Sequence, residues 1–244
     1  FERYAKTGAS ANAYTSFDRT AYLFTCTDKL DESLEILLDF VQSPYFTEET
    51  VKKEQGIIGQ EIRMGEDSPT RRVLFNLLRI LYHKHPVRID IAGTIESISQ
   101  ITPELLYGCY NTFYNLHNMV LVVAGNVTLD QVAAVADRTL KSAEDKHVER
   151  AGVDEPIDVV KPKIEQKMFY LGFKDFIPNG KGYKTPEELA SAEVLLEVLA
   201  GRSSYLFNNL MEKGLINSSF GSDFFEGPGY GTWLFGGESS NPDA

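Results

Sequence analysis

Hydrophobic side chains recur at helical spacing in several stretches of the chain, and each stretch follows a residue typical of a helix N-terminus. In Asp28–Gln42 the apolar residues fall at i, i+4, i+7 and i+8. Ser68-Pro69, Thr102-Pro103 and Thr185-Pro186 each place a capping side chain before a proline at the first helical position. The patterns predict helices over 1–7, 28–42, 48–64, 69–83, 103–116, 128–143, 186–199 and 203–213.

Four other stretches predict extended structure. Residues 8–27 are rich in Thr, Tyr, Phe and Ala with partial alternation, which indicates a strand or hairpin. Met119–Ala124 is a β-branched run that predicts a buried strand. Residues 167–174 predict another strand, and 216–238 predict one or two strands broken by Gly227-Pro228-Gly229.

The order of these elements shows no strict alternation of strand and helix. It favours an α+β fold, with two lobes of mostly antiparallel sheet and helices packed on one face. We expect the first lobe at 1–145, a charged linker at 146–163 and the start of the second lobe at 164–244. The chain begins at Phe1 inside a helix and ends without a closing element. We therefore expect a first lobe truncated at its N-terminus and an incomplete second lobe.

Composition excludes several classes of protein. The 244 residues are 43% hydrophobic and 24% charged, which is typical of a globular protein and not of a disordered or coiled-coil chain. No apolar run approaches the roughly 20 residues of a membrane span. The net charge of −11 disfavours nucleic acids and anionic membrane surfaces as partners.

The two cysteines, Cys26 and Cys109, lie in no C-x-x-C pattern and are too few for a disulfide framework. We expect both to be small buried hydrophobic residues in a reducing compartment. No signal peptide pattern is visible, and together these features predict a cytoplasmic protein.

Two carboxylates on one predicted helix are the main candidates for chemistry. Glu54 and Glu61 are seven residues apart, so they lie on one stripe of the helix, with Ile58 between them. Acids on a partly apolar stripe are costly unless they are paired, hydrogen-bonded or bound to a metal. A solvated helix face explains the same spacing. The four histidines form neither H-E-x-x-H nor H-x-x-E-H.

The predicted extended segment Gly8–Tyr22 contains small side chains, GASANAYTSFDRTAY. A strand of this kind leaves its backbone accessible, and its edge is able to accept an extended peptide as an added strand. A plain interior strand is the alternative. No phosphate-binding loop and no G-x-S-x-G elbow is present.

Taken together, three stretches resemble the insulinase/pitrilysin family of zinc peptidases, which carry an inverted H-x-x-E-H motif and include processing peptidases. Residues 8–15 resemble the family's G-x-x-x-N-A-x-T strand. Residues 54–61 resemble its E-(R/K)-x-x-(V/I)-x-x-E helix. The third stretch, in two parts at residues 85–98 and 110–125, resembles its P-x-x-x-x-x-x-G and N-M-x-L-x-x-x-G segments. The resemblance covers most of 1–145 and is looser from 164 onward.

The resemblance implies a role for four residues. Glu61 corresponds to the family's third zinc ligand and Glu54 to the acid that supports the site. Asn12 and Ala13 correspond to the edge strand whose backbone pairs with the peptide substrate. A carboxylate on a dry stripe suits zinc, which would lower the pKa of a bound water and polarise the scissile carbonyl. A second half of the peptidase chamber, on the same or another chain, is the implied partner.

The H-x-x-E-H motif itself is absent, and the resemblance places it upstream of Phe1. We therefore expect a fragment of a zinc-dependent metalloendopeptidase that is inactive and metal-poor in isolation. A non-catalytic structural or partner subunit of the same family is the alternative. A third reading is an unrelated α+β peptide-binding protein.

Overall fold

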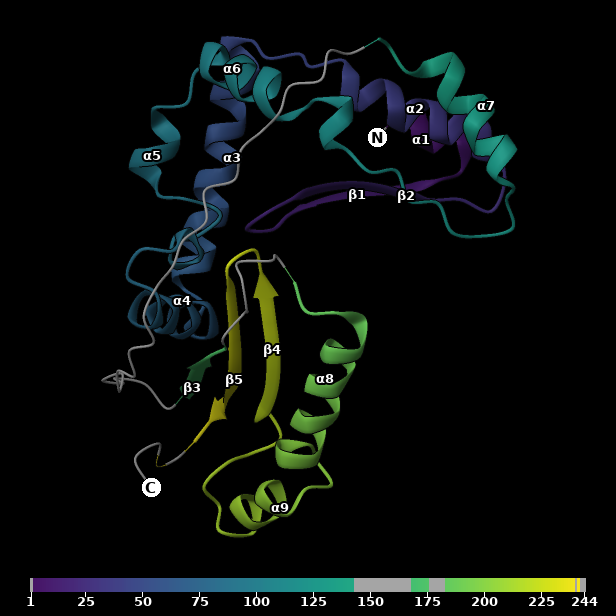
Figure 1. Cartoon of the computed structure of the whole chain (residues 1–244). Coiled ribbons are helices and arrows are strands. Elements are labelled where there is room, and N and C mark those ends of the chain that lie inside the picture. The colour runs from purple at the N-terminus through teal and green to yellow at the C-terminus, as the bar shows by residue number, and fades with distance from the viewer. Residues whose placement is uncertain (1, 143–167, 176–182, 240, 242–244) are drawn as a thin grey trace. The chain divides into compact units, whose positions relative to one another are not determined.

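The computed structural model describes residues 2–142, 168–175, 183–239 and 241 (Figure 1). Contacts divide the chain into two compact units. The first contains Phe1–Ile58 and Ile95–Arg150, and the second contains Gly59–Thr94 and Ala151–Ala244. The linker predicted at 146–163 lies outside the described residues.

The first unit consists of a β-hairpin and the helices that pack on it. Its elements are α1 (Glu2–Thr7), β1 (Ser10–Thr15), β2 (Thr20–Thr25), α2 (Leu30–Gln42), α5 (Ile95–Ser99), α6 (Pro103–Phe113), the 3-10 helix η2 (Leu116–Asn118) and α7 (Leu129–Thr139). Helix α3 (Glu48–Glu66) begins in this unit and ends in the second. The core forms where α2 meets α7, with Leu34, Leu38 and Val135 buried and Phe24 of the hairpin packed against them.

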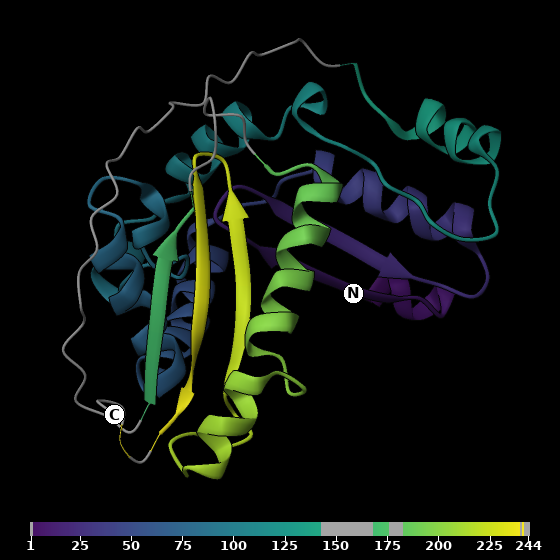
Figure 2. The same cartoon turned by 60° about the horizontal axis from the view of Figure 1, so that its bottom comes forward.

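The second unit is built around a three-stranded antiparallel sheet of β3 (Met168–Lys174), β5 (Tyr230–Glu238) and β4 (Gly221–Gly227), in that spatial order (Figure 2). Besides the sheet, this unit contains helices that follow α3 in the sequence and helices from the C-terminal part of the chain. They are α4 (Pro69–Leu81), the 3-10 helix η1 (Pro86–Arg88), α8 (Pro186–Ala200) and α9 (Tyr205–Glu212). The sheet thus joins two segments that are far apart in the sequence.

Helices cover both faces of this sheet. A Cβ added to Gly172 of β3 would meet the side chains of Leu77 and Leu81, so this face of β3 packs on α4. Neighbouring side chains of a strand point to opposite faces. Phe169 is three residues before Gly172 in β3, so its side chain points to the opposite face. There it packs against the cluster that contains Ala200 of α8. The α+β class is therefore confirmed, but helices lie on both faces of this sheet and not on one face as predicted.

Two buried side chains that follow α4 attach it to β5 and to the turn that precedes β5. The hydroxyl of Tyr82 donates to the Gly231 carbonyl, and it lies 2.7 Å from the Thr232 hydroxyl. The Nδ1 atom of His85 accepts from the Val87 amide, so Nε2 carries the proton and donates to the Pro228 carbonyl at 3.0 Å. These bonds explain why residues 59–94 group with the C-terminal sheet.

Two further expectations are wrong. Residues 119–124 form no strand, and Val120 and Val122 are 88% and 81% exposed. A strand requires a neighbour to satisfy its backbone, and the sheets of the described residues contain only β1 to β5. Cys109 is exposed on α6 and Cys26 is half-buried, so neither is a buried core residue. Neither cysteine is in a disulfide.

In the part of the chain that the structure describes, no helix has the length and apolar character needed to span a membrane.

Candidate functional site

Helix α3 carries both carboxylates that the sequence singled out. Its N-terminus is fixed by reciprocal contacts: the Thr50 amide donates to the Thr47 hydroxyl at 3.2 Å, and the Thr47 amide donates to the Thr50 hydroxyl at 2.9 Å. The helix continues unbroken to Glu66, two residues beyond the predicted end at Met64. Glu54 and Glu61 therefore lie on one side of a continuous helix, about 10 Å apart along its axis.

The environment of these carboxylates differs from the expected dry stripe. Glu54 and Glu61 are both exposed, and no hydrogen bond or salt bridge to either carboxylate is present among the described residues. Ile57 and Met64 occupy the adjacent stripe of α3 and are 42% and 66% exposed. This face of α3 therefore combines acidic and apolar groups and leaves both in contact with solvent.

The donor set for a metal is incomplete within the described residues. Among them, no group of three or more His, Cys, Asp or Glu side chains is close enough to hold a metal ion. Catalytic zinc takes three protein ligands, and Glu61 offers the chemistry of one of them. His85 is not a candidate, because both of its ring nitrogens are used in the attachment of α4 to the sheet.

The register of the hairpin shows which backbone groups of β1 point toward its open edge. The Ser16 amide donates to the Arg19 carbonyl at 2.8 Å and closes the turn. Hydrogen-bonded and non-hydrogen-bonded pairs alternate along an antiparallel ladder. The pairs Thr15↔Thr20 and Ala13↔Tyr22 are therefore non-hydrogen-bonded. The backbone groups of Ala13 point away from β2, toward the open edge of the strand.

Asn12 and Ala13 are linked at this edge. The side-chain Oδ1 atom of Asn12 accepts from the Ala13 amide at 2.8 Å. Asn12 faces Leu23 of β2, so its own backbone belongs to the ladder while its side chain covers the outward amide of the next residue. An exposed edge amide is a site for pairing with another strand, and here a neighbouring side chain occupies it.

Tyrosines that the sequence analysis did not single out hold the hairpin in place. Tyr22, opposite Ala13, contacts the Tyr114 hydroxyl through its own hydroxyl at 2.7 Å. Tyr110 stacks on Tyr114 and donates to the Val41 carbonyl at 2.6 Å. Burial and then the hydrogen bond with Tyr114 raise the pKa of Tyr22, which keeps it neutral. The i, i+4 spacing of Tyr110 and Tyr114, which places both rings on one face of a helix, is the sequence feature that could have identified them.

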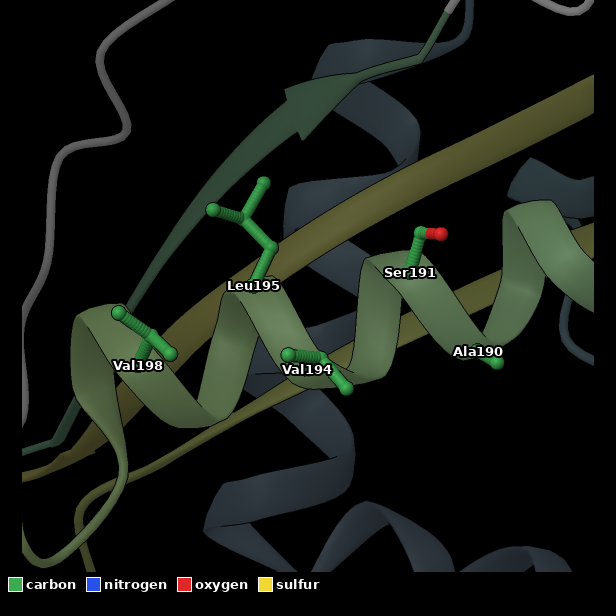
Figure 3. Close-up of a pocket in the computed structure, with 5 residues that line it drawn as sticks. All are labelled: Ala190, Ser191, Val194, Leu195 and Val198. Atoms are coloured by element: carbon green, nitrogen blue, oxygen red, sulfur yellow. The ribbon is translucent and has the colours of Figure 1, made fainter.

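The four predicted site residues therefore form two pairs, Glu54 with Glu61 on α3 and Asn12 with Ala13 on β1. None of them lines the shallow apolar pocket on α8 in Figure 3. That pocket is lined by Ala190, Ser191, Val194, Leu195 and Val198, and it offers one hydroxyl as its only polar side-chain group. It lacks the convergent polar groups that small-molecule sites require.

Comparison with known proteins gives matches along the chain. A family profile described as Insulinase (Peptidase family M16) matches residues 1–95, and one described as Peptidase M16 inactive domain matches residues 100–244. A protein named uncharacterized zinc protease YmfH from Bacillus subtilis (strain 168) is 44% identical over 252 residues. That match covers 100% of this chain and 59% of the relative. The mitochondrial-processing peptidase subunit beta of Caenorhabditis elegans is 34% identical over 54% of this chain and 29% of its own length.

A crystal structure described as that of an M16-like peptidase from Alicyclobacillus acidocaldarius is similar in fold, with a TM-score of 0.86 and 38% identity. The similarity covers 100% of this chain and 59% of that one. The chain thus spans about three-fifths of the length of the Bacillus subtilis relative and of the Alicyclobacillus acidocaldarius peptidase.

Proposed function

Because the chain belongs to the insulinase family of peptidases, M16, we propose that it is part of a zinc-dependent metalloendopeptidase. The observation that supports this most directly is Glu61, an exposed carboxylate on a rigid helix with no partner among the described residues. A carboxylate held in this way is available to a metal, whereas an ion-paired one is not. The names of the relatives point to zinc as that metal.

We assign Glu61 as one zinc ligand, with Glu54 supporting the site from the same face of α3. Zinc, when bound, activates a water molecule and polarises the substrate carbonyl. The remaining ligands and the general base would come from parts of the parent protein outside these 244 residues. A second half of the peptidase chamber, on the same or another chain, would complete the enclosure around the substrate.

The substrate would bind as an added strand on the edge of β1. Ala13 presents its amide and carbonyl outward, and Tyr22, Tyr110 and Tyr114 fix the hairpin on which it lies. Backbone pairing provides affinity for many peptide sequences. Asn12 would release the Ala13 amide when a peptide takes its place, so the substrate exchanges one hydrogen bond for another.

A non-catalytic partner subunit of the same family is the second candidate. It is favoured by the match of residues 100–244 to a profile described as an inactive domain. The coding sequence upstream of Phe1 separates the two candidates. An H-x-x-E-H motif there, with one zinc per parent molecule and zinc-dependent peptide hydrolysis, supports the peptidase. Its absence, with no hydrolysis, supports the partner subunit.

The isolated chain is expected to bind zinc weakly and to hydrolyse no peptide, because a single carboxylate gives little affinity for the ion. Zinc titration by calorimetry, with the Glu61→Gln chain as control, measures this. Stoichiometric tight binding that Glu61→Gln removes would contradict the expectation.

In the parent protein, Ala13→Pro is expected to lower kcat/KM for peptides by about 10- to 100-fold, the equivalent of one or two hydrogen bonds. Proline removes the outward amide, and it is tolerated on edge strands where the N–H does not enter the ladder. Steady-state kinetics with an unstructured peptide measures the effect.

The control for Ala13→Pro is a peptide substrate methylated at successive backbone nitrogens. Methylation at alternate positions should lower kcat/KM of the wild-type enzyme, and it should matter less for Ala13→Pro. Uniform loss at all positions, or none, would exclude an added strand.

A further inference from the structure

Gln55 is a polar residue in the buried stripe of α3. Val51 and Ile62 belong to this stripe and are buried, and half-buried Gln55 lies between them at helical spacing. Gly59, the next member, is buried but has no side chain. The middle of the stripe therefore contributes no large apolar side chain to the packing of α3.

The side chain of Gln55 joins α3 to the connection between α5 and α6. Its Nε2 group donates to the Ile98 carbonyl at 2.9 Å and to the Ile101 carbonyl at 3.0 Å. A side-chain amide nitrogen carries two protons, so both are used. Ile98 belongs to α5, and Ile101 directly precedes Thr102, the N-cap of α6 (Figure 1). One side chain thus attaches α3 to the segment that links two other helices.

A second contact lies just before α3. The Phe46 amide donates to the Tyr107 hydroxyl of α6 at 3.1 Å, and the two rings meet edge to face with their centroids 5.0 Å apart. This contact alone would hold the beginning of α3 but leave the helix free to turn about its axis. The hydrogen bonds of Gln55, further along the helix, fix that rotation as well.

The rotation of α3 decides where its two candidate carboxylates point. At roughly 100° per residue, Glu54 lies about 100° around the helix from Gln55, and Glu61 lies about 120° around it in the same sense. Both carboxylates therefore turn together when the stripe that contains Gln55 turns. Hydrogen bonds are directional and select one rotation, whereas apolar side chains are able to pack in several.

We propose that Gln55 is a positioning residue, whose two hydrogen bonds hold α3 in the rotation that directs Glu54 and Glu61 toward the metal. This inference rests on the proposed function, in which Glu61 is a zinc ligand. Both amide protons of Gln55 are used by backbone carbonyls, so it acts through the backbone of α3 and not on the metal or the substrate.

Gln42 offers a matched control, because it makes the same kind of contact between α2 and α7. Its Nε2 group donates to the Leu38 carbonyl at 2.7 Å and to the Thr139 carbonyl at 3.4 Å, and its Oε1 atom accepts from the Lys141 amide. Like Gln55, it is half-buried. Methionine has a helix propensity similar to that of glutamine but donates no hydrogen bond. Gln42→Met therefore removes at least as many hydrogen bonds as Gln55→Met, away from α3.

The test compares the two methionine variants in the parent protein. Both should lower the melting temperature by about 4–8 °C, as expected for the loss of two hydrogen bonds. Only Gln55→Met should weaken zinc binding and lower kcat, each by about 10-fold or more, with KM little changed. In the metal-free protein, hydrogen exchange of the α3 amides should become faster in Gln55→Met and not in Gln42→Met. Gln55→Lys restores donors and should recover zinc affinity and kcat.

The outcomes separate a positioning role from a structural one. Equal effects of the two methionine variants on zinc affinity and kcat would overturn the proposal, and so would a Gln55→Lys protein that is no better than Gln55→Met. If Gln55→Met does not fold, Gln55→Asn, whose amide is one carbon shorter, makes the same comparison with Gln42→Asn. A wild-type parent that neither binds zinc nor hydrolyses peptides would instead refute the proposed function, and this inference with it.

Discussion

Glu61→Gln in the parent protein is expected to lower kcat/KM for peptide hydrolysis by about 1,000-fold or more and to remove bound zinc. A glutamine oxygen is a neutral and weaker ligand, and metal polarisation of the carbonyl supplies several kcal/mol of transition-state stabilisation. A loss of about 4 kcal/mol corresponds to a factor of about 1,000. Glu61 is exposed and unpaired among the described residues, so the substitution should leave the fold intact.

Two variants on the same helix provide the comparison. Glu54→Gln should lower activity by about 10- to 100-fold while zinc is retained or only weakened, as for residues that support a metal ligand. Glu66→Gln, which is exposed on another side of α3, should have no effect. Zinc content by mass spectrometry and steady-state kinetics distinguish the three. Full zinc and full activity in Glu61→Gln would show that Glu61 is an ordinary helix acid.

The parts of the fold that the sequence predicted correctly depend on short-range interactions. Ser68, Thr102 and Thr185 each accept from the backbone amide three residues later and begin their helices where expected. Glu188 completes a capping box with Thr185. These interactions lie within one helical turn, so residue type and spacing alone specify them.

The parts that the sequence did not predict depend on distant partners. Residues 119–124 have the composition of a strand, but pairing requires a neighbour that the described residues do not provide. The hydrogen bonds of Tyr82 to β5 and of His85 to the turn before β5 each join residues more than 140 positions apart, so no local sequence pattern indicates them. For the same reason the grouping of residues 59–94 with the C-terminal sheet was not anticipated.

The candidate site divides in the same way. The shared face of Glu54 and Glu61 follows from helix geometry and was predicted. Their exposure was not, because burial depends on what packs against α3. The outward direction of the Ala13 backbone follows from the register of the hairpin and from the Ser16–Arg19 hydrogen bond at its turn, which the sequence alone does not specify.

Gly236→Ala is expected to destabilise the second unit strongly. Gly236 lies in β5, the central strand, between Tyr170 of β3 and Gly221 of β4. A Cβ at this position would overlap the Phe169 carbonyl oxygen and a ring carbon of Tyr170. The first obstacle is backbone, so β3 must move away from β5. Overpacking of this kind costs about 3 kcal/mol or more.

Gly221→Ala is the matched control, because Gly221 pairs with Gly236 on the same rung of the sheet. A Cβ there meets nothing within 4 Å, and its φ is not in the left-handed region. Both substitutions restrict the unfolded chain equally, which by itself stabilises by about 0.4–1 kcal/mol. The difference between the two variants therefore measures the close approach of β3 to β5. Urea unfolding followed through the single tryptophan, Trp233 of β5, reports on this sheet. Equal midpoints would mean that β3 does not approach β5 as closely as the structure shows.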